Sequence, residues 1–137
     1  MQYNYDFEIA SLLIMTIILL HFVFVRQFPG EKTRVFGWLL FVCEAECLMN
    51  ILSCVGLANA ALVPQRLNEV LAFAFFVLEG ASSYLIYRYF MAACALRGRE
   101  RTVFAAAGMI PFAVFLVLVA VTPVTGFFYY FRDGSYY

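Results

Sequence analysis

Three glutamates interrupt stretches of the sequence that are otherwise apolar: Glu44 and Glu46 in one stretch and Glu79 in the next. An ionised side chain at the middle of a membrane costs at least about 2.5 to 3.5 kcal/mol, so each acid should face protein or water. If the two stretches pair as an antiparallel helical hairpin, the three carboxyl groups lie at nearly one depth, where desolvation and mutual repulsion favour the protonated form. The pattern indicates a proton-coupled or cation-binding site. The alternative is that neutral carboxylic acids hydrogen-bond to neighbouring helices and hold them together.

Other polar side chains share helical faces with these acids. One face of the second stretch combines an acid, an amide and three thiols: Cys43, Glu46, Cys47, Asn50 and Cys54. In the third stretch, Glu79 is followed by the small residues Gly80, Ala81 and Ser82, and by Ser83 at position i+4. Small residues let another helix approach closely, and the hydroxyl groups can also line a ligand pocket. Glu44, Glu46, Asn50, Glu79 and Ser83 are therefore the candidate residues of a ligand or proton site.

Two basic side chains near the ends of these stretches are further candidates. Arg88 lies nine residues after Glu79, about 13 Å along a helix, so it either extends to the membrane surface or reaches Glu44 on the neighbouring helix as a charge partner. His21 lies near Arg26 and is expected at the membrane surface. Its titration range also makes it a candidate for pH sensitivity.

Several classes of site are disfavoured by the residues present. The four cysteines show no CxxC spacing, and the single histidine lies far from them in the sequence, so we expect no metal site and no cofactor. No motif of a nucleophilic triad, a phosphate-binding loop or a metallohydrolase occurs, and we expect no enzymatic activity. With 9 Lys plus Arg against 9 Asp plus Glu, the chain has no net charge that would attract nucleic acid.

The candidate residues lie on elements that composition and length identify as membrane spans. Of 137 residues, 65% are hydrophobic and 13% are charged. Four apolar stretches, 9–25, 35–57, 67–91 and 103–121, each come close to the roughly 20 residues that cross a bilayer as a helix. We therefore predict an all-α, polytopic membrane protein: a single transmembrane domain, 1–137, built as a four-helix bundle. An aromatic tail, 122–137, follows the last helix.

The basic residues predict how these helices cross the membrane. Three of them flank the first loop and three the third: Arg26, Lys32, Arg34, Arg97, Arg99 and Arg101. The second loop carries only Arg66. Short loops rich in Lys and Arg stay in the cytoplasm, so both termini should lie outside a bacterial inner membrane. Aromatic residues near both ends would then form an outer interfacial belt: Tyr3, Tyr5, Phe7, Phe127, Phe128, Tyr129, Tyr130 and Phe131. Arg132-Asp133-Gly134 is typical of a turn.

Five segments give the sequence a familiar pattern: NYDFEIASLLIM, FPGEKTRVF, NAALVPQRLNEVLAF, RGRERT and TPVTGFFYYFRDGSYY. The chain resembles the N-terminal multi-helix membrane region of bacterial GGDEF diguanylate cyclases and of seven-helix sensor histidine kinases. The resemblance implies a signal-input module that continues into a cytoplasmic GGDEF or kinase output domain. No GGDEF motif occurs in the chain itself, so we expect it to be part of a longer protein.

Three functions are compatible with these observations. The first is a non-catalytic membrane sensor module that binds a small ligand or ion between the second and third helices and the outer aromatic tail. The second is a small proton- or cation-coupled transporter that works as a homo-oligomer, although small multidrug exporters keep their essential glutamate in the first helix, where this chain has only Glu8 at the outer start. The third is a structural subunit that packs beside larger membrane partners.

Overall fold

A computed structural model describes residues 6–25, 30–59, 62–94, 98–129, 131–132 and 135–136, the last two pairs by their backbone alone. The chain forms four helices: α1 (Asp6–Phe24), α2 (Glu31–Ala58), α3 (Gln65–Ala93) and α4 (Gly98–Thr125). A short hairpin of β1 (Phe131–Arg132) and β2 (Ser135–Tyr136) follows, with Phe131 opposite Tyr136. All four helices are long and apolar enough to cross a membrane, which confirms the all-α prediction of four such helices.

Each helix begins before the apolar stretch that predicted it. α2 starts at Glu31 rather than at 35, and α4 starts at Gly98 rather than at 103. The added turns are rich in charged residues, which a helix accepts where it leaves the hydrocarbon for the interface. At about 1.5 Å per residue, α2, α3 and α4 span about 42 Å, close to the thickness of a bilayer with its headgroup regions.

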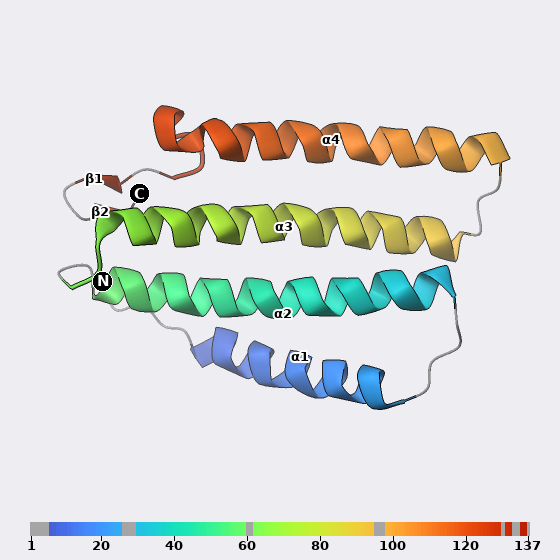
Figure 1. The fold of residues 1–137 in the computed structure, drawn as a ribbon, viewed down its shortest axis with the longest axis horizontal. Coiled ribbons are helices and arrows are strands. Elements are labelled where there is room, and N and C mark those ends of the chain that lie inside the picture. The colour runs from blue at the N-terminus through green and yellow to red at the C-terminus, as the bar shows by residue number, and fades with distance from the viewer. Residues whose placement is uncertain are drawn as a thin grey trace.

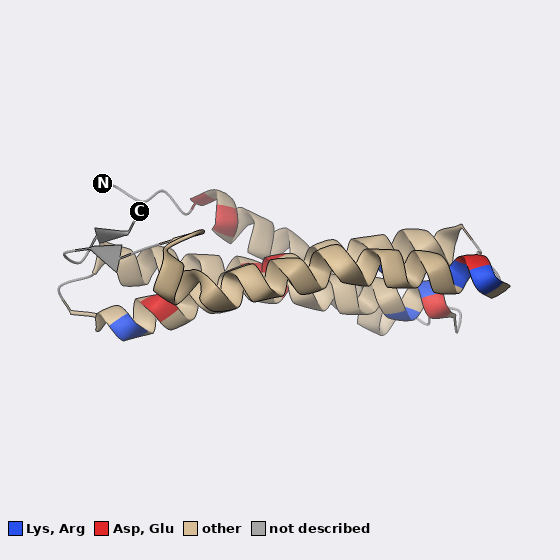
Figure 2. Cartoon of the chain, turned by 90° about the horizontal axis from the view of Figure 1, so that it is seen from above, with Lys and Arg blue, Asp and Glu red and all other residues tan. Residues whose placement is uncertain are grey.

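The four-helix bundle is open, with its helices side by side in a row (Figure 1). The extensive contacts among the described residues join only consecutive helices, α1 with α2, α2 with α3, and α3 with α4. A view turned by 90° shows the same row edge-on, with most of the basic residues at one end and acidic residues midway along it (Figure 2). We call the end at which α2 and α4 begin the basic end. Because the row is open, few side chains of the described residues are buried; they include Leu40, Ala72 and Val119.

Glycines allow close approach at each of the three helix contacts. A Cβ atom added at any of four positions would lie closer than 3 Å to a side chain of the adjacent helix. The pairs are Gly37 with Phe22, Gly56 with Asn68, Gly80 with Phe115, and Gly108 with Tyr87. In a membrane, apolar burial does not drive helices together, and association depends on van der Waals packing instead. Small residues permit this packing.

The segment after α4 turns back onto α3. Gly126 adopts a φ of 66°, a left-handed conformation that commonly ends helices because glycine has no Cβ. The following rings of Phe128 and Tyr129 stack on Phe76, with centroids 5.3 and 5.6 Å away, and Tyr129 is only 2% exposed. Tyr129 therefore packs within the protein and Phe128 is partly buried, whereas Phe127 is exposed.

Some predictions fall on residues outside the described part of the chain. These are the aromatic, basic and turn residues Tyr3, Tyr5, Arg26, Arg97, Tyr130, Asp133 and Gly134, and the side chains of Phe131 and Arg132.

Candidate functional site

The three glutamates lie near the midpoints of their helices. Glu44 is 13 residues from the first residue of α2 and 14 from the last, and Glu79 is 14 residues from either end of α3. The acids nevertheless face different neighbours. Glu44 faces α1, Glu46 faces α3, and Glu79 lines a groove between α3 and α4. The five residues grouped by the sequence therefore do not surround one common pocket.

Glu44 and Asn50 belong to the contact between α1 and α2. Thr16 Oγ1 donates to Glu44 Oε1 over 2.7 Å, and Asn50 Nδ2 donates to Glu8 Oε1 over 3.2 Å. The second carboxylate oxygens of Glu8 and Glu44 are buried without a hydrogen-bond partner among the described residues. These contacts match the interpretation of membrane acids as links between helices. The sequence analysis placed Glu8 only at the outer start of the first helix and assigned no role to Thr16. The reason is that polar residues do not gather on one face of α1.

Glu46 is half-buried between α2 and α3. Its carboxyl group lies beside the Ser82 hydroxyl and within electrostatic range of Glu79. Ser82 is 7% exposed, and its hydroxyl donates to the backbone carbonyl of Glu79 over 2.9 Å. Ser82 therefore connects the acid on α2 to the turn of α3 that carries the acid of the groove.

Glu79 and Ser83 lie on the side of α3 that faces α4. The two helices form a groove of about 590 Å³, which we call the α3/α4 groove. Its α3 wall consists of Glu79, Gly80, Ser83, Tyr84 and Tyr87. Its α4 wall consists of Phe104, Ala107, Gly108, Pro111, Phe112 and Phe115. The volume suits a ligand of drug-like size, and the lining is predominantly apolar with few polar groups, as in most small-molecule sites.

The local sequence explains why the groove exists. Gly80 and Gly108 let the Phe115 and Tyr87 rings of the facing helix approach closely, while the rings of Tyr84 and Phe112 stack across the groove at 4.9 Å. Pro111 lies inside α4 and has no N–H, so the carbonyl of Ala107 lacks its usual helical partner. The α4 wall was not identified from the sequence. The sequence did offer one signal for this wall: Pro111 lies within an apolar stretch, three residues after Gly108.

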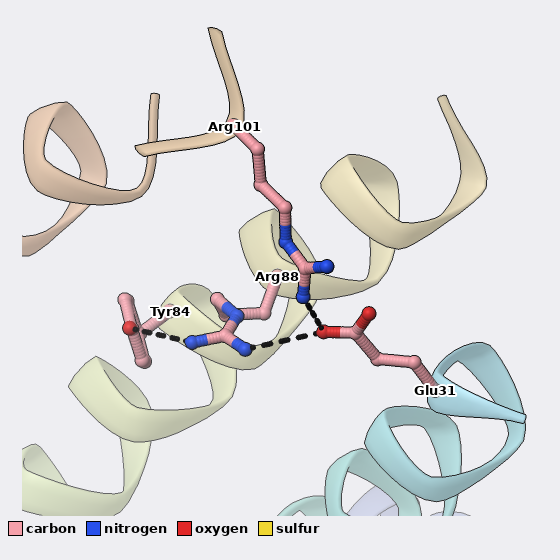
Figure 3. A network of polar contacts seen from close by, with 4 residues as sticks. All are labelled: Glu31, Tyr84, Arg88 and Arg101. Carbon is pink, nitrogen blue, oxygen red and sulfur yellow. Dashed lines mark hydrogen bonds and ion pairs between the residues drawn. The ribbon is translucent and has the colours of Figure 1, made fainter. Parts of the chain in front are cut away.

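A charged network joins three helices at the basic end (Figure 3). Glu31 of α2 accepts from Arg88 of α3 at 3.5 Å and from Arg101 of α4 at 2.5 Å. Arg88 also donates to the hydroxyl oxygen of Tyr84 over 3.4 Å. Of the two placements considered for Arg88, the side chain takes the one toward the helix end, and its ion-pair partner there is Glu31 rather than Glu44.

Neutralising the shared carboxylate in Glu31→Gln should lower the free energy of unfolding by less than about 1 kcal/mol per ion pair. The side chains of this network are between about a third and a half exposed, so solvent weakens each pair. Thermal unfolding in low salt and in 1 M NaCl measures the effect, which should disappear at high salt. Glu100→Gln is the control, because Glu100 has no ion pair within the described part of the chain. A loss that persists in 1 M NaCl would contradict this account.

Of the remaining candidates, the Cys54 thiol belongs to the contact between α1 and α2, where its Sγ donates to Asn50 Oδ1 over 4.0 Å. His21 is exposed in the last turn of α1, where its backbone carbonyl accepts from Val25. Cys43, Cys47, Cys54 and Cys94 are free thiols. Within the described ranges, no three His, Cys, Asp or Glu side chains converge as a metal site would require.

No protein-family description, curated protein or solved structure matches the chain in comparisons with known proteins.

Proposed function

We propose that this chain is the non-catalytic signal-input module of a bacterial signalling protein, and that it binds a small ligand in the α3/α4 groove. The observation that carries the proposal is a contact shared by the groove and the charged network. Tyr84 lines the groove with its ring and contacts Arg88 through its hydroxyl. A ligand that displaces this ring also displaces a member of the network at the basic end.

The chain of contacts runs from the groove to two other helices. Tyr84 stacks on Phe112 of α4, Arg88 follows Tyr84 by one helical turn, and Glu31 connects Arg88 to both α2 and Arg101 of α4. A ligand shifts a conformational equilibrium only if it binds one arrangement more tightly than the other. A ligand that inserts between the Tyr84 and Phe112 rings binds only the arrangement in which the rings are separated. It therefore binds that arrangement more tightly than the stacked one.

The orientation of the module follows from its charges. Lys32 and Arg34 lie in the first turn of α2, and Arg99 and Arg101 in the first turn of α4, which is the basic end. Arg66 lies in the first turn of α3, at the opposite end. Under the positive-inside rule the basic end is cytoplasmic and both termini are outside the inner membrane. The network of Glu31 then lies at the cytoplasmic surface, where a GGDEF or kinase output domain of the longer protein would respond to it.

Filling the groove with a side chain tests the coupling without a ligand. Ala107→Trp places an indole in the groove, and it should change the distance between the starts of α2 and α4 by about 1 to 2 Å, the usual size of helix shifts. The distance is measured by electron paramagnetic resonance between nitroxide labels at Lys32→Cys and Thr102→Cys. The full chain is used in lipid nanodiscs, with its native cysteines replaced by alanine.

Ala106→Trp is the matched control, because Ala106 is exposed on the same helix and does not line the groove. Its distance distribution should equal that of the labelled parent. An unchanged distribution in Ala107→Trp, in a protein that still elutes as a folded species, would overturn the proposed input role. A change of the same size in both variants would do so as well.

A further inference from the structure

We propose that the α3/α4 groove selects an apolar organic cation, which places its positive centre beside the Glu79 carboxylate. This inference rests on the proposed function and names the chemical class of its ligand. The groove combines one acidic side chain, a hydroxyl group and aromatic rings, and none of its lining residues is Lys, Arg or His. Any charge that these lining side chains present is therefore negative.

The polar groups of the groove are suited to receive positive charge. Glu79 contributes its carboxylate from the midpoint of α3, and Ser83 contributes a hydroxyl oxygen one turn later. The phenolic hydrogen of Tyr87 is already donated to the carbonyl of Phe104. An anion would find few donors here and would face the Glu79 carboxylate.

The remaining lining favours an organic cation over a metal ion. The rings of Tyr84, Phe112 and Phe115 line the groove, and the electron-rich faces of aromatic rings attract a cation within about 6 Å. Hard metal ions require six or more oxygen ligands or retained water, whereas the described residues contain no cluster of three acidic, thiol or imidazole groups. A groove of about 590 Å³ with mostly apolar walls instead accommodates a bulky apolar body that carries one positive charge.

The position of Glu79 along α3 is a further argument for a ligand with a positive charge. Glu79 is exposed in the groove although it lies halfway along a helix that is long and apolar enough to span a membrane. An uncompensated carboxylate at that depth is costly, and a bound cation compensates it without a water-filled cavity. An apolar cation can also reach the groove from the bilayer, because its own charge is spread over an apolar body.

Two probes of matched shape and opposite charge test the inference: tetraphenylphosphonium and tetraphenylborate. Binding of each probe to the full chain in nanodiscs is measured against empty nanodiscs of the same lipid, which corrects for partition into lipid. The cation should bind at least about tenfold more tightly than the anion. Glu79→Gln should reduce affinity for the cation by about tenfold or more, while Glu79→Asp should retain most of it, because it retains the charge. Ala107→Trp should prevent binding by occupying the groove.

Glu69→Gln is the matched control on the same helix, since Glu69 lies outside the groove and its side chain accepts from Gln65. Its affinity for the cation should equal that of the parent. Equal affinity for the two probes, an unchanged affinity in Glu79→Gln, or no binding of the cation to the parent would each overturn the inference. None of these binding results decides the input role, which is tested separately by the distance measurement on Ala107→Trp. An unchanged distance with normal cation binding would overturn the input role alone.

Discussion

Replacing Gly80 by valine should separate α4 from α3 and lower the free energy of unfolding by about 1 to 3 kcal/mol, the usual range for overpacked contacts. A Cβ at this position would lie 2.7 Å from Cδ1 and Cε1 of the Phe115 ring. That ring is in turn held against Phe128 at a centroid distance of 5.4 Å, so it has little room to retreat. Thermal unfolding of the purified chain in detergent measures the loss.

The control for this variant is Gly30→Ser. Gly30 precedes α2 with an extended backbone, φ −167°, and a Cβ there meets no atom within 4 Å. Serine is also a favourable residue at a helix N-cap, so the control should keep its full stability. An unfolding temperature of Gly80→Val equal to that of the parent would show that the contact between α3 and α4 does not depend on this close approach.

Replacing Glu44 by leucine should leave the unfolding temperature unchanged or raise it. One carboxylate oxygen of Glu44 accepts from Thr16, but the other is buried without a partner among the described residues. Leucine removes this unpaired group and makes insertion of α2 more favourable by about 2.5 to 3.5 kcal/mol, if the acid is inserted charged. The Thr16 hydroxyl remains paired, because it also lies 2.8 Å from the carbonyl oxygen of Leu12.

Thr16→Val is the informative partner of this variant. It removes the hydroxyl and leaves Glu44 with two unpaired oxygens, which should cost about 1 to 3 kcal/mol. In the double variant with Glu44→Leu this penalty should disappear, because no acid remains to be satisfied. Thermal unfolding of the parent, the two single variants and the double variant completes the cycle. A stability loss in Glu44→Leu as large as that in Thr16→Val would contradict the account.

The helices themselves were determined by the sequence alone. Four apolar stretches separated by loops with Pro64 or with charged residues predict four helices, and the structure contains them. The reason is physical: backbone groups in hydrocarbon must be satisfied within the segment, so an apolar stretch of this length has few alternatives to a helix. Only the helix ends differ, because charged turns continue a helix into the interface without a hydropathy signal.

Helical period placed Glu79 and Ser83 on one face, as the structure has them. It also placed Glu46 and Asn50 on one face, but these two side chains contact different helices, α3 and α1. Glu79 and Ser83 lie four residues apart and line the same groove. The period does not say which neighbour occupies that face. Glu44 and Asn50 turned out to contact α1, and Arg88 turned out to contact Glu31.

Tertiary structure decided these partners. Lipid is as apolar as the inside of a helix bundle, so hydrophobic patterning in a membrane helix does not separate a face that meets lipid from one that meets protein. The partners depend instead on where small residues permit close approach. Gly37 brings α1 to α2, and Gly80 with Gly108 brings α4 to α3. The open row that results distributes the acids over separate contacts and leaves Glu79 facing the groove.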